Sequence, residues 1–275
     1  MALPAYASTG QRLLYVAARV LTGLALAFLV CPVLIVLPLS FTSGSVLTFP
    51  LPGISLQWYE DFFSNPLWTG ALANSLFIGV ISTIIATLAG TLAAIGIHNS
   101  DFKLKPLIVG ILILPLAVPI VIVAVAAFYF FAQLHLVGSF SSIIIMHVVL
   151  SLPFVVVTVL ATLQGFDPNM VRAASSLGAS PLVAFRTVTL PIILPGVVSG
   201  GLFAFVTSFD ETVVALFLAT PTQRTLPRQI FSGVAESVSP TITVAAVILL
   251  LVSVGLMLVL EYLRARAAKM RGLSE

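Results

Sequence analysis

The sequence predicts an all-α membrane protein with six transmembrane helices. Hydrophobic residues make up 60% of the chain and charged residues only 8%, against roughly 25% charged residues in soluble domains. Six stretches reach the length of about 20 apolar residues that a helix needs to cross a bilayer. These stretches are apolar on every side, whereas the strands of a membrane barrel alternate apolar and polar residues. A bundle of six helices is therefore the expected architecture.

In chain order, the expected spans lie near residues 20–41, 72–97, 107–132, 141–163, 192–217 and 241–263. They form one transmembrane domain over residues 20–263, preceded by the N-terminal segment 1–19 and followed by the basic tail 264–275. Each connection between spans is too short to bury a core of its own. Hydrolysis of ATP and capture of a soluble ligand are therefore expected to belong to other chains.

Prolines and small residues indicate how the helices pack. Pro115 and Pro119 lie in the third span and Pro153 in the fourth. Proline lacks a backbone donor, so it is expected to kink or locally open these helices, although membrane helices also tolerate proline without such a role. The fifth span carries small residues at every fourth position, which allow another helix to approach closely: Gly196, Gly200, Ala204 and Ser208.

Basic residues predict the orientation, because Lys and Arg in short loops are retained on the cytoplasmic side. Of the 12 basic residues, all but Arg224 and Arg228 fall in the terminal segments or in the connections after the second and fourth spans. Both termini and connection 164–191 are therefore expected to be cytoplasmic. The net charge of +3 reflects this bias and suits anionic membrane lipid; nucleic-acid binding is not expected.

Connection 164–191 is the most informative segment of the chain. Residues 167–195, DPNMVRAASSLGASPLVAFRTVTLPIILP, are too polar and too rich in proline to form another span. Asp167-Pro168 predicts the start of a helix, Gly178 a left-handed stop, and Ser180-Pro181 a second start. Two short helices joined by a glycine turn are expected, and Pro191 and Pro195 would close this element as the chain re-enters the membrane.

The first of these helices would present one apolar face, formed by Met170, Ala173, Ala174 and Leu177. An exposed apolar face on a compact loop favours a protein partner. The alternative is a helix that lies in the lipid interface, but such helices usually have a strongly charged polar face, which this segment lacks.

The spacing of this segment resembles the "EAA" loop of the inner-membrane permease subunits of bacterial ABC importers, through Ala173-Ala174, Gly178 and the sequence from Val188 to Pro191. The similarity extends over most of residues 70–262 and is greatest to spermidine/putrescine-type permeases. It includes Asn74-Ser75-Leu76, PLAVP at 115–119, SLPFVVV at 151–157, SFDE at 208–211 and TLP at 225–227.

This resemblance implies the type I ABC importer permease fold, with a cytoplasmic coupling helix between the fourth and fifth spans. The chain would not be an enzyme and would hold no cofactor, because ATP and Mg would bind to a separate ABC ATPase present in two copies. A second homologous permease, expected to form a heterodimer with this chain, and a periplasmic or extracellular substrate-binding protein would complete the importer in the bacterial inner membrane. The substrate implied is a polyamine such as spermidine or putrescine.

The resemblance also implies which residues contact the ATPase. They are Asp167, Met170, Arg172, Ala173, Ala174, Leu177, Gly178, Ser180, Pro181, Leu182, Phe185, Leu190 and Pro191. Arg172 departs from the family pattern, which usually has an acidic residue there. That difference places in doubt any salt bridge that an acid at this position would make with the ATPase.

Asp210 and Glu211 are the candidates for a substrate pathway or a gate. A carboxylate near the middle of a bilayer costs about 3 kcal/mol on insertion scales, so it is expected to face a polar cavity or a partner. Adjacent residues of a helix point about 100° apart, so at most one would face the pathway. One carboxylate would offer a polyamine a weak site through charge-assisted hydrogen bonds. A salt bridge with Arg224 or Arg228, and a place in water at the helix end, are the alternatives.

Other residues of note have structural interpretations. Trp58, Tyr59 and Trp68 fit an interfacial aromatic belt rather than a substrate cage. Cys31, expected to be buried in the first span, is the only cysteine and permits no disulfide within the chain.

Other classes of function find less support. The spacing of the three histidines, His98, His135 and His147, fits no common metal site, and neither a phosphate-binding loop nor a nucleophile elbow occurs. A secondary transporter working without an ATPase is the main alternative, but the chain has no clear internal repeat and no central acid or base. An intramembrane enzyme would have His147 as its one candidate base.

Overall fold

The computed structural model describes residues 8–236 and 238–270, and most of these are helical, with one isolated β-bridge between Thr42 and Ile54. In chain order the α-helices are α1 Thr9–Leu39, α2 Gln57–Ser64, α3 Pro66–Asn99, α4 Lys105–Ile113, α5 Ile120–Gln133, α6 Phe140–Gln164, α7 Asn169–Ser176, α8 Pro181–Ala184, α9 Leu190–Phe209, α10 Val213–Leu218, α11 Leu226–Glu236 and α12 Thr241–Met270. Short 3₁₀ segments, η1 Leu114–Leu116 and η3 Pro221–Gln223, and a π-helical segment, η2 Phe185–Thr189, lie between them. Five helices are long and apolar enough to cross a membrane, and α4 with α5 forms a sixth crossing if that bent pair is one span.

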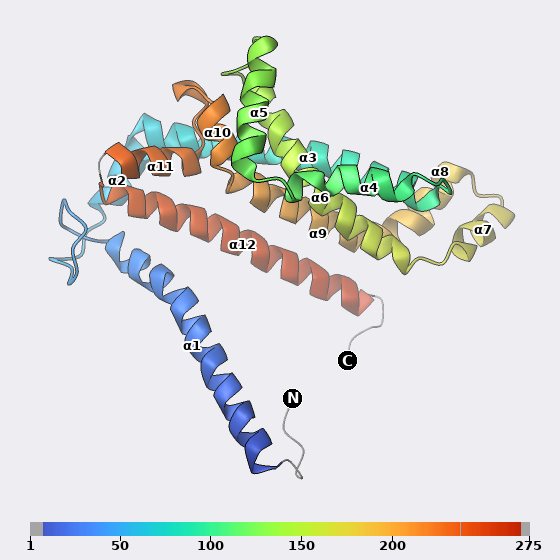
Figure 1. Ribbon diagram of the computed structural model, residues 1–275, viewed down its shortest axis with the longest axis horizontal. Helices are drawn as coiled ribbons and strands as arrows, with labels where there is room; N and C mark the ends of the chain where they lie inside the picture. The colour runs from blue at the N-terminus through green and yellow to red at the C-terminus, as the bar shows by residue number, and fades with distance from the viewer. Residues whose placement is uncertain (1–7, 237, 271–275) are drawn as a thin grey trace.

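Three of the long helices, α3, α6 and α9, lie side by side and form the centre of the molecule (Figure 1). Lipid tails are as apolar as leucine, so such helices are held by close packing rather than by removal from water. The stripe of small residues on α9 makes this possible, as predicted. A Cβ added to Gly200 would lie 2.9 Å from the Cα of Val155 on α6, and one added to Gly196 would overlap Thr162.

The prolines of the third span break it, as predicted. Pro115 lies in η1 and Pro119 caps α5, and the helical axis turns by 97° between the two halves. As a result α5 stands away from the bundle (Figure 1). Pro153 does not interrupt its helix, since α6 continues from Phe140 to Gln164.

The fifth span begins earlier and ends earlier than residues 192–217. From Pro181 to Phe209 the chain forms one helical run of 29 residues, so the expected second short helix is the first part of this span. Pro191 and Pro195 do not separate the two, and that expectation was wrong. The π-helical turn at Phe185–Thr189 locally widens the helix next to Pro191, where a backbone donor is missing.

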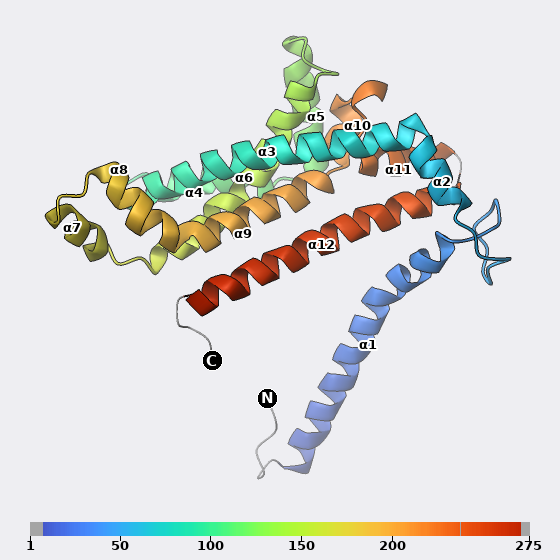
Figure 2. The same cartoon turned by 180° about the vertical axis from the view of Figure 1, so that it is seen from behind.

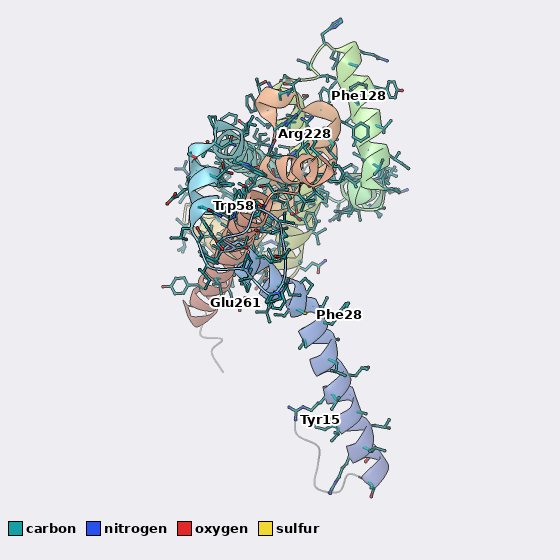
Figure 3. All side chains as sticks on the ribbon, turned by 90° about the vertical axis from the view of Figure 1, so that its left-hand side faces the viewer. Tyr15, Phe28, Trp58, Phe128, Arg228 and Glu261 are labelled. Atoms are coloured by element: carbon teal, nitrogen blue, oxygen red, sulfur yellow. The ribbon has the colours of Figure 1, made fainter. Side chains whose placement is uncertain are left out.

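The first span, α1, leaves the bundle in both views (Figures 1 and 2) and has no buried residue. Cys31 is therefore exposed, not buried as expected. Phe28 on α1, 79% exposed, and Phe128 on α5 both point away from the body of the molecule (Figure 3). Residues 1–7 of the predicted N-terminal segment and 271–275 of the predicted tail lie outside the described residues.

The end of the molecule that carries α2 and α11 has a small core of its own, formed by Phe62, Trp68, Leu226 and residues of α12. Trp68 is only 7% exposed, so it belongs to this core and not to the expected aromatic belt. The indole nitrogen Nε1 of Trp58 donates to the Gly44 carbonyl at 3.1 Å. These contacts fix the loop that follows α1.

Candidate translocation pathway and coupling surface

The two acidic residues lie in a break between α9, which ends at Phe209, and α10, which begins at Val213. The carboxylate of Glu211 turns inward and caps α10. Its Oε1 accepts a hydrogen bond from the Val214 amide at 2.7 Å, and its Oε2 accepts one from the Ala215 amide at 3.1 Å. A carboxylate that accepts from the first amides of a helix also complements the positive end of the helix dipole.

Glu211 is 5% exposed and His147, on α6, is fully buried beside it. The imidazole Nε2 lies 3.5 Å from Oε2 of Glu211, and Nδ1 lies 2.7 Å from the Ser208 hydroxyl on α9. A buried carboxylate is strongly unfavourable unless it is paired and hydrogen-bonded. The partner of the buried acid is therefore His147, together with the amides of α10.

The two arginines proposed as alternative partners make other contacts in the described structure. Arg224 donates through Nη1 to Oε1 of Gln229 at 3.2 Å. Arg228 donates through Nη1 to the carbonyls of Ala219 and Thr220. Burial, and after it the positive charge of Arg224, lowers the pKa of the Arg228 guanidinium. The arginines thus hold the segment between α10 and α11 rather than the acids.

Asp210 has the opposite orientation and is exposed. It lines a cavity of about 630 Å³ that is walled by the break between α4 and α5, by α6 and by α9. It also lines a second cavity of about 380 Å³ formed with α11 and α12. Among the described residues that line these two cavities, the charged ones are Asp210 and Glu211. The two neighbouring acids therefore diverge, and Asp210 is the one that a solute can reach.

The residues predicted to contact an ATPase gather at the end of the molecule formed by α7 and α8 (Figure 1). The carboxylate of Asp167 accepts a hydrogen bond from the Asn169 amide at 2.9 Å. The helix α7 starts at Asn169, one residue later than predicted. Gly178 has a φ of +87°, and Ser180 caps the following helix by accepting from the Val183 amide. The predicted left-handed turn and second start are both present.

The outward side of this turn is apolar. Leu177 is 90% exposed, Leu182 58% and Met170 49%, and Ala173 is also exposed. The inward side closes over a cavity of about 470 Å³, which is lined by Arg172, Phe185, Pro181 and the end of α3. Nη1 of Arg172 donates to Oδ1 of Asn169 at 3.2 Å. Ala174, Leu190 and Pro191 lie on the same turn or at the start of α9.

The contacts of His147 with Ser208 and Glu211 are not predicted from the sequence. A histidine within an apolar span is itself a signal, because an ionisable side chain in a membrane helix usually has a named partner. Its partner could not be identified, since Ser208 is 61 positions away. Within the residues that the structure describes, no group of three or more potential ligands forms a metal site.

Comparison with known proteins agrees with this architecture. Residues 86–269 match the family described as "Binding-protein-dependent transport system inner membrane component". The chain is 35% identical over 240 residues to the spermidine/putrescine transport system permease protein PotC of Escherichia coli K12. The aligned residues cover 87% of this chain and 90% of the relative. It is 33% identical over 256 residues to the putrescine transport system permease protein PotI of the same organism, with 90% of each chain covered.

Among solved structures, the fold is similar to a chain of a bacterial alginate ABC transporter in complex with an alginate pentasaccharide-bound periplasmic protein. The TM-score is 0.71 at 18% identity, covering 94% of this chain and 95% of the other. The family match covers residues 86–269, and the similarity to the two permeases extends over 87% and 90% of the chain. The chain belongs to the family of binding-protein-dependent transport system inner membrane components.

Proposed function

We propose that this multi-pass membrane protein forms half of the translocation pathway of an ATP-driven importer for a polyamine such as spermidine or putrescine. The observation that carries the proposal is the 35% identity to a spermidine/putrescine permease over 87% of the chain. The solute would pass the break between α9 and α10, where the bundle is hollowed on both sides of Asp210.

The chemistry of Asp210 supports a cationic solute. Its carboxylate is exposed in walls that are otherwise largely apolar, and an ammonium group would gain charge-assisted hydrogen bonds there. One carboxylate gives a weak site, which suits a pathway, because a solute that binds tightly would not leave. Glu211 is committed to His147 and α10 and would act on the solute only through the shape of the break.

The surface of residues 167–191 would dock on the ATPase, and two copies of that ATPase would drive the importer. Its exposed apolar side chains, above all Leu177, are the kind of surface that a partner groove covers. A second, homologous permease would cover α1, which has no buried residue within this chain. An outer substrate-binding protein would deliver the solute.

Reconstitution tests this function. The complex is purified through a tag on this chain, placed in liposomes with its binding protein, and assayed for uptake of labelled spermidine and of a neutral disaccharide, with and without ATP. We expect spermidine uptake that requires ATP. Polyamine uptake without ATP, or a complex that lacks an ATPase, would contradict the proposal.

The role of Asp210 has its own test in the same assay. Asp210→Asn should lower the rate of spermidine uptake about ten-fold. Losing one hydrogen bond to a charged group costs about 1.5 kcal/mol, which corresponds to a change of about ten-fold. Asp101→Asn removes an exposed acid near the start of α4 and serves as the matched control, with uptake unchanged. Equal loss in both variants would indicate a general effect of charge instead.

A further inference from the structure

The cluster formed by His147, Ser208 and Glu211 connects α6 to both sides of the break in the fifth span. Ser208 precedes the break, on α9, and Glu211 lies within it. His147 reaches both, through Nδ1 at 2.7 Å and through Nε2 at 3.5 Å. All three residues are buried; Glu211 borders the cavity of about 630 Å³, but both oxygens of its carboxylate are engaged by amides of α10.

The hydrogen-bonding capacity of Glu211 limits how the neutral imidazole of His147 can be arranged in this cluster. Glu211 accepts hydrogen bonds from two amides, so its carboxylate needs a donor, not an acceptor, from His147. In the neutral imidazole, the Nε2 hydrogen then faces Oε2 of Glu211 at 3.5 Å, which is too long for a formed hydrogen bond, and Nδ1 accepts the hydrogen of the Ser208 hydroxyl. The result is a directed chain from Ser208 through His147 to Glu211, anchored on α6.

This chain has a consequence for the residue next to Glu211. The residues between Phe209 and Val213 are not helical, so the direction of the Glu211 side chain is set by its contacts with the amides of α10 and with His147. Holding Glu211 inward leaves its neighbour Asp210 on the open side, where both cavities lie.

We propose that His147 is a positioning residue: by holding Glu211 and Ser208 it fixes the break between α9 and α10 and so keeps position 210 facing the cavity. This inference rests on the proposed function, in which position 210 lies on the path of the solute. It assigns His147 no contact with the solute.

Two isosteric replacements separate the two contacts of the imidazole. The side-chain oxygen of asparagine lies close to the place of Nδ1, so His147→Asn keeps an acceptor for Ser208 but loses the contact with Glu211. The amide nitrogen of glutamine reaches the place of Nε2, so His147→Gln keeps a donor to Glu211. Ser151→Ala is the matched control, because Ser151 is one turn further along α6 and also joins α6 to α9, by donating to the Ala204 carbonyl at 3.1 Å.

The measurement is the rate at which a cysteine at position 210 reacts with a cationic, water-soluble methanethiosulfonate reagent. The full complex is used without nucleotide, in a Cys31→Ser, Asp210→Cys background that removes the one native cysteine. We expect His147→Asn to slow the reaction by up to about ten-fold, because the variant loses the contact between the imidazole and the buried carboxylate. His147→Gln and Ser151→Ala should react within about two-fold of the parent.

Thermal unfolding of each purified complex shows whether a variant is folded. If His147→Asn does not fold, the labelling rate of His147→Gln still tests the proposal. Equal reaction rates in all variants would overturn the proposal, and so would a loss in His147→Gln as large as in His147→Asn. Labelling needs no polyamine, so the two proposals can fail separately. The expected labelling pattern without spermidine uptake would count against the polyamine function alone, and spermidine uptake with equal labelling would count against the positioning role alone.

Discussion

At the scale of single residues, Gly178 has the most demanding backbone conformation on the predicted coupling surface. Its φ is +87°, and a Cβ added there would meet no atom within 4 Å. Any cost of a side chain therefore comes from the left-handed backbone, about 1–2 kcal/mol for a residue with a Cβ, and not from a clash.

We expect Gly178→Val to abolish most ATP-driven uptake while the complex still assembles, because the turn between α7 and α8 would open. Uptake and ATP hydrolysis are measured on the same liposomes. Gly178→Asn should retain more activity, since asparagine tolerates the left-handed region. Gly165→Ala is the control, because Gly165 has a φ of −90° and its added Cβ would make only an ordinary contact. Full activity in Gly178→Val would count against a coupling role for this turn.

The local residue patterns of this turn were readable from sequence, whereas the pairing of the buried acid was not. The conformation of Gly178 and the cap by Ser180 depend on a few neighbouring residues, so turn chemistry predicted both. The helical period predicted that Asp210 and Glu211 diverge, but the premise was wrong, because both residues lie in the break between α9 and α10 and not on a helix. Which of them turns inward depends on His147, a residue far away in the chain, and no local pattern contains that contact.

At the scale of helices, α6 and α9 approach so closely that glycine is required between them. A Cβ at Gly200 would lie 2.9 Å from the backbone Cα of Val155, which cannot move without shifting α6. Gly200→Ala should therefore destabilise the protein by about 1–3 kcal/mol, the usual cost of overpacking.

The melting temperature of the purified complex measures this effect. Gly96→Ala is the comparison, since Gly96 lies within α3 and its added Cβ would meet nothing within 4 Å. Alanine there should be neutral or stabilising by up to about 1 kcal/mol, because it favours the helix. A Gly200→Ala variant as stable as Gly96→Ala would show that the two helices adjust their separation.

Prolines illustrate why the form of a helix is harder to predict than its presence. Pro115 and Pro119 break the third span, whereas α6 passes through Pro153, and the run from Pro181 to Phe209 contains Pro191 and Pro195. Each proline removes one donor, but the surrounding helices and a local π turn decide whether the chain bends. Those neighbours come from distant parts of the sequence.

At the scale of the whole molecule, the distribution of basic residues predicts how the chain is inserted. The connection that contains Lys103 is expected to face the cytoplasm and the segment that contains Thr222 the outside. Both side chains are exposed, so each can be replaced by cysteine in a Cys31→Ser background.

In intact spheroplasts, an impermeant thiol reagent should label Thr222→Cys and leave Lys103→Cys unlabelled. Permeabilised spheroplasts should give labelling of both, which controls for the reactivity of the Lys103 position. Labelling of Lys103→Cys in intact spheroplasts would mean that the orientation is reversed, and the α7–α8 surface would then face away from any cytoplasmic ATPase.

The run from Pro181 to Phe209 joins the two regions that an importer must coordinate. Its 29 residues span about 43 Å at a rise of about 1.5 Å per residue, from the turn beside Gly178 to the residue before Asp210. If this rod tilts by about 5° around one end, simple geometry moves the other end by about 4 Å, roughly the thickness of a polyamine chain. Contacts near the pivot would then be kept, whereas those near the far end would have to change as the passage opens or closes.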